Sequence, residues 1–161
     1  MTSTNTASNQ SISPSLPLVG WKEHISLPDW GVKGLRAKID TGARTSAIHV
    51  AEIEMLPGDI ARFEVVVHER NPRKTVWVET PLVREAVVKP SSGERQQRPV
   101  VKTRLRLGGQ SFEIEATLVS RKGMRCRMLV GREALAGRFL VDTEHAYMYK
   151  RKPKPKPRAE A

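Results

Sequence analysis

The chain has 161 residues and a formal net charge of +11, from 28 Lys and Arg against 17 Asp and Glu. This length suits one domain with one core. The single cysteine excludes an internal disulfide and a zinc site built on several cysteines, and no stretch is long and apolar enough to span a membrane as a helix. Aromatic residues are sparse and Val, Ile and Leu dominate the apolar runs, which favours a β-rich fold.

The composition divides the chain into three segments. Residues 1–17 are rich in Ser, Thr and Asn and carry no charge, which predicts disorder. They lack the apolar stretch of a signal peptide, so we expect a cytoplasmic protein. Residues 18–149 form the predicted domain. Residues 150–161 alternate Lys or Arg with Pro, hold six basic side chains against one Glu, and predict an extended, disordered tail. A solubilising end is the favoured interpretation of this tail, with binding of nucleic acid as the alternative.

The first elements lead to an acidic residue at a strand end. We predict a strand over residues 18–27, a turn over 28–31 and a second strand over 35–39. Apolar and polar side chains alternate along this second strand, which is typical of a half-buried strand. Thr41 and Gly42 then break it, because glycine opens the backbone to positive φ. The sequence therefore predicts that the Asp40 carboxylate lies at the mouth of a tight turn with backbone N–H groups nearby.

The middle of the chain predicts several short strands. These cover residues 45–51 (strand or loop), 62–69, 74–79 and 81–89. Residues 90–94 then form a polar tip with a glycine, flanked by Val pairs at 87–88 and 100–101. This pattern favours a protruding hairpin, whose tip is either a flap over the Asp40 site or an ordinary loop. The flap candidates are Ser91, Ser92 and Gly93.

Residues 101–119 give the clearest hairpin signal. Two glycines, Gly108 and Gly109, separate two runs that alternate apolar and polar residues, as in a two-residue hairpin turn. The cross-strand pairs predicted by this register are Leu105 with Phe112, Arg104 with Glu113 and Lys102 with Glu115. One face of the hairpin is therefore apolar and the other carries charge pairs.

The C-terminal elements are short. We predict a buried strand over residues 126–130 and a helix of one to two turns over 132–136, ended by Gly137. Closing strands are predicted over residues 139–141 and 146–149.

Two motifs that are far apart in the chain point to a family. One is the turn Asp40-Thr41-Gly42-Ala43, and the other is the apolar triplet, glycine and short helical run of residues 128–135. Together they resemble the paired segments of retropepsin-like aspartic peptidases. With Gly20-Trp21 and longer matches at residues 37–49, 98–101 and 131–142, the chain is most similar to a bacterial, RimB-like branch. That branch is associated with the RimK glutamate ligase and is often labelled ATP-dependent zinc protease.

This resemblance implies an all-β, closed retropepsin-like barrel, mostly antiparallel, with one short helix after Gly131. It also implies aspartic endopeptidase activity without a cofactor, with Asp40 as the catalytic group and Thr41, Gly42 and Ala43 supporting its turn. Gly42 would offer its N–H to the carboxylate, and Thr41 would brace the turn across a two-fold axis. Hydrolysis by aspartates requires two carboxylates that share one proton. The chain has only one such turn, so a homodimer would supply the second copy of Asp40.

Several residues flank this site in the motifs. They are Arg44, Ser46, His49, Gly131 and Arg132. An arginine near an aspartic dyad would favour its doubly ionised form, which bears on the pH optimum. For His49 a structural role outweighs a catalytic one. The substrate would be a peptide or protein, and a ribosomal protein or a RimK-type ligase are the partners that the resemblance implies.

Two alternatives to the peptidase interpretation differ in how well the sequence supports them. The sequence argues against zinc or ATP chemistry, because it has neither a His-Glu-x-x-His helix nor a phosphate-binding Gly-rich loop, so we expect no metal. The stronger alternative is a catalytically silent β-barrel that binds an anionic partner, either RNA or a poly-glutamylated protein, through its basic surface.

Overall fold

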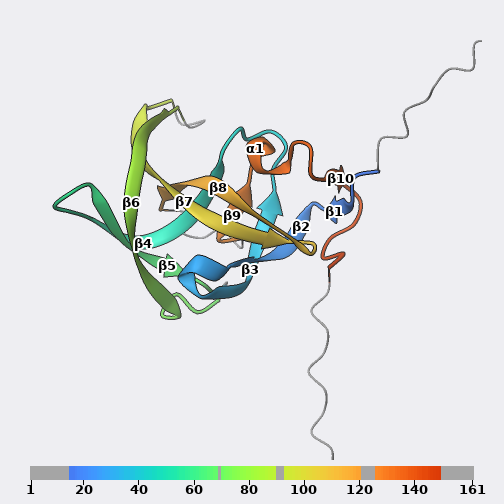
Figure 1. Ribbon diagram of the computed structural model, residues 1–161, viewed down its shortest axis with the longest axis horizontal. Helices are drawn as coiled ribbons and strands as arrows, with labels where there is room; N and C mark the ends of the chain where they lie inside the picture. The colour runs from blue at the N-terminus through green and yellow to red at the C-terminus, as the bar shows by residue number, and fades with distance from the viewer. Residues whose placement is uncertain (1–14, 69, 90–92, 121–125, 150–161) are drawn as a thin grey trace, which may run out of the picture.

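The computed structural model describes residues 15–68, 70–89, 93–120 and 126–149, and within them strands predominate (Figure 1). The elements are β1 (Leu18–Gly20), β2 (Lys22–Leu27), a 3₁₀ turn (Pro28–Trp30), β3 (Val32–Ile39), β4 (Ser46–Leu56), β5 (Ile60–Val66), β6 (Thr75–Val88), β7 (Gln96–Leu107), β8 (Gln110–Val119), β9 (Met128–Val130), α1 (Arg132–Leu135) and β10 (Leu140–Asp142). The predicted all-β fold with one short helix is confirmed.

The strand pairings form a ring. Starting from β2, they run through β3, β9, β4, β8 and β7 and return to β2, while β5 and β6 make a second path from β4 to β7. Most pairs within the described residues are antiparallel, and β1–β10, β3–β9 and β4–β8 are parallel. The core lies inside this ring, where Phe63 is fully buried and meets Trp30 edge to face at 5.2 Å.

The hairpin of β7 and β8 has the predicted register. Leu105 pairs with Phe112, Arg104 with Glu113 and Lys102 with Glu115. The hairpin of β6 and β7 is also present, with Val87 opposite Gln97. Ser91 and Ser92 lie outside the described residues, and Gly93 adopts φ +92°. The flap interpretation of this hairpin stays a prediction.

Four predicted strands have different limits. The first is split at Trp21, whose backbone N–H donates to the His145 carbonyl at 3.0 Å. The strand predicted over 45–51 continues to Leu56. The strands predicted over 74–79 and 81–89 are a single strand, β6, that runs through Pro81. Pro81 is tolerated because β6 leaves β5 at this point and pairs with β7 from Leu82 onward.

Two predictions near the C-terminus were wrong in detail. The last strand before Gly131 begins at Met128, so Cys126 and Arg127 precede it. Residues 146–149 form no strand. Instead, their backbone N–H groups donate to β2, from Tyr147 to the Lys22 carbonyl and from residues 148 and 149 to the Glu23 carboxylate.

Candidate active site

The arrangement of three strands positions Asp40. Strands β3 and β4 follow one another in the chain, yet β9 lies between them, parallel to β3 and antiparallel to β4. The Asp40 N–H donates to the Val130 carbonyl at 2.9 Å. The loop of residues 40–45, which joins β3 to β4, is therefore held against the segment that follows β9.

The turn after β3 fixes the Asp40 carboxylate. Asp40 is half-buried, and its Oδ1 accepts hydrogen bonds from the N–H groups of Gly42 at 3.0 Å and Ala43 at 3.1 Å. The hydrogen bond expected from Gly42 is thus present. Thr41 is exposed beside them. Two donors on one oxygen orient the carboxylate and leave Oδ2 as its other acceptor.

Gly131 is the point of closest approach between the two motifs. A Cβ at this position would lie 2.6 Å from the Thr45 carbonyl oxygen and 3.0 Å from that of Ala43. The Gly131 N–H donates to the Ser46 hydroxyl at 3.1 Å, and Ser46 is 3% exposed. A side chain here would push the loop away, so only glycine permits this packing.

The first residues of α1 complete the contact. The N–H of Arg132 donates to the Ala43 carbonyl at 2.8 Å, and that of Glu133 donates to the Arg44 carbonyl at 3.1 Å. The Arg44 guanidinium also binds the Glu133 carboxylate at 2.9 Å. The Arg132 guanidinium lies 3.5 Å from the Thr41 carbonyl. The orphan N–H groups at the start of the helix are thus satisfied by the loop that follows Asp40.

A cavity of about 500 Å³ adjoins this loop. It lies between the loop, α1 and β6, and its lining residues are Arg44, Thr45, Arg84, Ala86, Val87 and Glu133. On its β6 side, Arg84 binds Glu115 by a short ion pair of 2.6 Å. The cavity has the size of a small-ligand pocket or of a few peptide side chains. The β6–β7 hairpin therefore forms one wall beside the Asp40 loop.

Of the residues predicted to flank the Asp40 turn, the structure brings all but His49 together. The turn residues, Arg44, Ser46, Gly131 and Arg132 make one connected network. His49 is buried on β4 at 4% exposure, and its backbone N–H donates to the Arg127 carbonyl at 2.7 Å. These observations favour the structural role. Sequence reasoning missed Glu133 and Arg84. Glu133 could have been found from its place in the Gly-Arg-Glu motif, whereas Arg84 carries no motif.

The described residues show neither a metal site nor a membrane-spanning helix. Among them no group of three or more His, Cys, Asp and Glu side chains is placed to hold a metal ion. Within the same part of the chain, no helix has the length and apolar character needed to cross a membrane.

Comparison with known proteins identifies the family of this chain. Residues 18–152 match the RimB-like family, described as retropepsin-like aspartic endopeptidase RimB. A probable alpha-L-glutamate ligase from Parasynechococcus marenigrum is 38% identical over 133 residues, which are 81% of this chain and 28% of that protein. One from Desulfotalea psychrophila is 35% identical over 128 residues, 78% of this chain and 28% of that protein. The chain thus spans less than a third of the length of these relatives.

A solved structure has the same fold over its whole length. The crystal structure of a protein of unknown function from Legionella pneumophila superposes with a TM-score of 0.69 at 27% identity, and the match covers 84% of this chain and 100% of that one. Together with the geometry around Asp40, the family match over most of the domain establishes that the chain belongs to the RimB-like family of retropepsin-like aspartic endopeptidases.

Proposed function

We propose that this protein is an aspartic endopeptidase that acts as a homodimer, with one Asp40 from each copy in the catalytic pair. The observation that carries the proposal is the Asp40 carboxylate at the end of β3, half-buried and held through one oxygen by the N–H groups of Gly42 and Ala43. A fixed, solvent-reaching carboxylate on a turn that is braced by a second motif is the half-site that aspartic catalysis needs.

The chemistry follows from two such carboxylates in contact. Like charges this close do not both ionise, so one Asp40 keeps a proton while the other is a base. The base takes a proton from a water molecule, whose oxygen attacks the peptide carbonyl. The acid protonates the carbonyl oxygen, and proton transfer to the amine then releases the two products.

The substrate is proposed from charge and from the relatives. These relatives are named glutamate ligases, and the present chain is strongly basic. We therefore propose a protein with an added glutamate tail as the substrate, with a ribosomal protein and a RimK-type ligase as partners in the cytoplasm. A positive surface would raise the local concentration of such an acidic tail.

The test is cleavage by the wild type and by two matched variants. Asp40→Asn removes the base and is expected to abolish hydrolysis of acidic and unfolded peptides between about pH 4 and about pH 8. Asp59→Asn is the control, because Asp59 is exposed in the β4–β5 turn at φ +56°, which asparagine also adopts readily. Full activity in Asp59→Asn and none in Asp40→Asn supports the proposal. Activity that survives Asp40→Asn contradicts it.

The dimer has a separate test. When wild type and Asp40→Asn are mixed in equal amounts and allowed to exchange subunits, mixed dimers hold only one intact Asp40. Activity should fall to about half of that of the same amount of wild-type chain alone, because only like pairs of wild type remain active. Unchanged activity would mean that each chain works by itself. Absence of any cleavage by the wild type would favour the silent binding module instead.

A further inference from the structure

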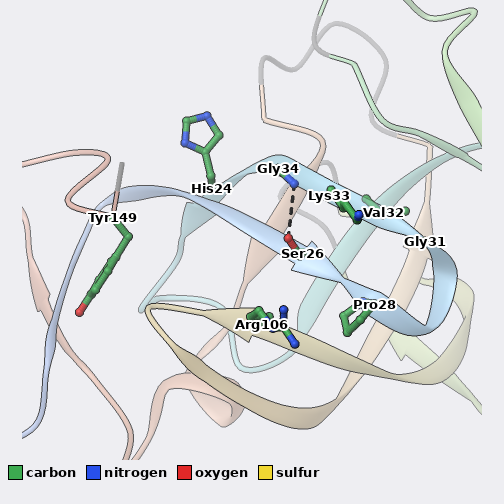
Figure 2. Close-up of a pocket in the computed structure, with 9 residues that line it drawn as sticks. All are labelled: His24, Ser26, Pro28, Gly31, Val32, Lys33, Gly34, Arg106 and Tyr149. Atoms are coloured by element: carbon green, nitrogen blue, oxygen red, sulfur yellow. Dashed lines mark hydrogen bonds between the residues drawn. The ribbon is translucent and has the colours of Figure 1, made fainter. Parts of the chain in front are cut away.

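A basic groove lies over β2, β3 and β7, and the loop of Asp40 contributes none of its lining residues; Figure 2 shows the first of its two parts. It consists of two cavities of about 460 and 450 Å³ that share His24 and Gly34 as lining residues. Lys33 and Arg106 line the first cavity, and Arg36 and Arg70 line the second. We call this double cavity the His24 groove.

The strand registers place its side chains on one face. His24 pairs with Arg36 across β2 and β3, and Ser26 pairs with Arg106 across β2 and β7. Directly opposed residues in an antiparallel pair point to the same face, and His24 and Ser26 are two positions apart on β2. Three neighbouring strands therefore contribute to a single cationic surface.

A β-bulge brings Lys33 to the groove. Ile25 pairs with Leu35 and Leu27 pairs with Val32, so Ser26 alone faces both Lys33 and Gly34. Gly34 takes φ +65°, and its N–H donates to the Ser26 hydroxyl at 3.4 Å (Figure 2). A bulge of this kind redirects the side chain beside the glycine. The extra residue on β3 thus adds a lysine to the groove lining.

The charges in the first cavity are not compensated. On β7, Lys102 and Arg104 lie opposite Glu115 and Glu113, whereas Arg106 lies opposite Ser111 on β8 and Ser26 on β2. Within the described residues, neither Lys33 nor Arg106 takes part in an ion pair, and no Asp or Glu lines either cavity. The two nearest cations that precede Arg106 on this strand, Lys102 and Arg104, face carboxylates, so Arg106 and Lys33 mark a local site for an external anion.

The aromatic rings at the groove are already engaged. Tyr147 stacks on His24 with ring centroids 4.7 Å apart. The Tyr149 ring packs directly over Gly108, and its hydroxyl donates to the Leu18 carbonyl at 2.9 Å. These rings are therefore less suited to stack on nucleic acid bases, which is how proteins hold single strands. The cations favour carboxylates on a flexible peptide.

We propose that the His24 groove binds an acidic peptide segment, and that it acts as a second docking site for the substrate of the proposed peptidase, on which this role rests. Along β3, Arg36 and Asp40 occupy alternate outward positions four residues apart, a distance of about 13 Å at 3.3 Å per residue. An extended acidic chain in the groove can therefore continue toward the end of β3. The groove would hold the glutamate-rich part of the substrate while another part lies near Asp40.

The experiment measures binding of a labelled oligo-α-glutamate peptide to the full-length Asp40→Asn protein by fluorescence anisotropy. Arg106→Gln in this background should weaken binding about five- to tenfold, because it removes a cation whose cross-strand partners are serines rather than carboxylates. Arg104→Gln is the matched control on the same strand and face, and it should change affinity less than about twofold. The basic tail is present in both variants, so its attraction cancels in the comparison.

These measurements distinguish failure of the groove proposal from failure of the peptidase proposal. Equal weakening in Arg106→Gln and Arg104→Gln, or no binding of the peptide at low salt, would overturn the groove proposal. So would tighter binding of an oligo-uridine of the same charge, which would assign the groove to RNA. In the active protein, Arg106→Gln should raise KM for acidic peptides and leave kcat unchanged. If Arg106-dependent binding occurs but the wild type cleaves nothing, the groove stands as a binding site and the peptidase proposal fails.

Discussion

Arg44 and Glu133 are joined twice, once through backbone and once through side chains. The Glu133 N–H donates to the Arg44 carbonyl at 3.1 Å, and the Arg44 guanidinium binds the Glu133 carboxylate at 2.9 Å. These residues are 89 positions apart in the chain. The double link connects the loop after Asp40 to the first turn of α1, so the two motifs of the sequence form one structural unit.

The side-chain part of this link should contribute little stability. The Arg44 and Glu133 side chains are 79% and 49% exposed, and exposed ion pairs typically contribute less than about 1 kcal/mol. A double-mutant cycle with Arg44→Gln and Glu133→Gln, followed by urea unfolding, should give a coupling energy below this value. A coupling above about 2 kcal/mol would mean that the pair is shielded from water, unlike the exposed pairs for which the small value holds.

The close packing at Gly131 should make it intolerant of a side chain. Gly131→Ala places a methyl group against the Thr45 and Ala43 carbonyls, and such overpacking costs about 1–3 kcal/mol of unfolding free energy. The displaced loop should also strongly reduce the proposed peptidase activity, even where the protein stays folded. Gly137→Ala is the control, because its Cβ would meet nothing within 4 Å and only its φ of +75° is unfavourable, at about 1 kcal/mol. Full activity in Gly131→Ala would contradict the tight contact.

The buried Glu23 carboxylate should hold the C-terminal segment in place. It is fully buried and accepts hydrogen bonds from the N–H groups of Gly20, Met148 and Tyr149. Glu23→Ala leaves these donors without an acceptor, which should cost about 3 kcal/mol or more. Hydrogen exchange at residues 147–149 should accelerate most. Glu85→Ala, an exposed position on β6, should stay within about 0.5 kcal/mol of the wild type. Similar exchange rates in both variants would refute this role.

The turn that follows β10 should contribute to acid sensitivity. The backbone N–H of Glu144 and the side chain of His145 bind the Asp142 carboxylate and hold its pKa below the usual value of 3.8. Because the pKa is lowered in the folded protein, the carboxylate favours folding above its usual pKa, and this contribution is lost as the pH falls through the folded value. An NMR titration should place the Asp142 midpoint below 3.8, and Asp142→Asn should flatten the stability curve below about pH 4. A midpoint above 3.8 would contradict it.

Local patterns predicted those elements whose partners are close in sequence. The β7–β8 hairpin was predicted with its register because two glycines separate two alternating runs, and the turn alone then fixes every pair. The strand before Asp40 and the helix after Gly131 were likewise readable from alternation and from a glycine next to helix-forming residues. The same hairpin register also indicates that Arg106 faces a serine on β8. That Arg106 faces a second serine on its other side follows only from the pairing of β7 with β2.

Elements that depend on distant partners could not be read in this way. The break at Pro81 suggested two strands, but β6 is continuous because it changes partner there from β5 to β7. Residues 146–149 have the apolar and aromatic composition of a strand, yet the N–H groups of Met148 and Tyr149 bind the Glu23 side chain. The His24 groove was missed because Arg106 and Lys33 come together only when β2 pairs with both β3 and β7.

The insertion of β9 between β3 and β4 has a consequence for biosynthesis. During translation, the ribosome releases the Asp-Thr-Gly turn long before Gly131, Arg132 and Glu133 emerge. Until then the turn lacks the backbone groups that hold it, and such long-range contacts form late and slowly. A nascent chain, or one truncated before Gly131, therefore lacks the backbone contacts that hold the Asp40 loop in the folded protein.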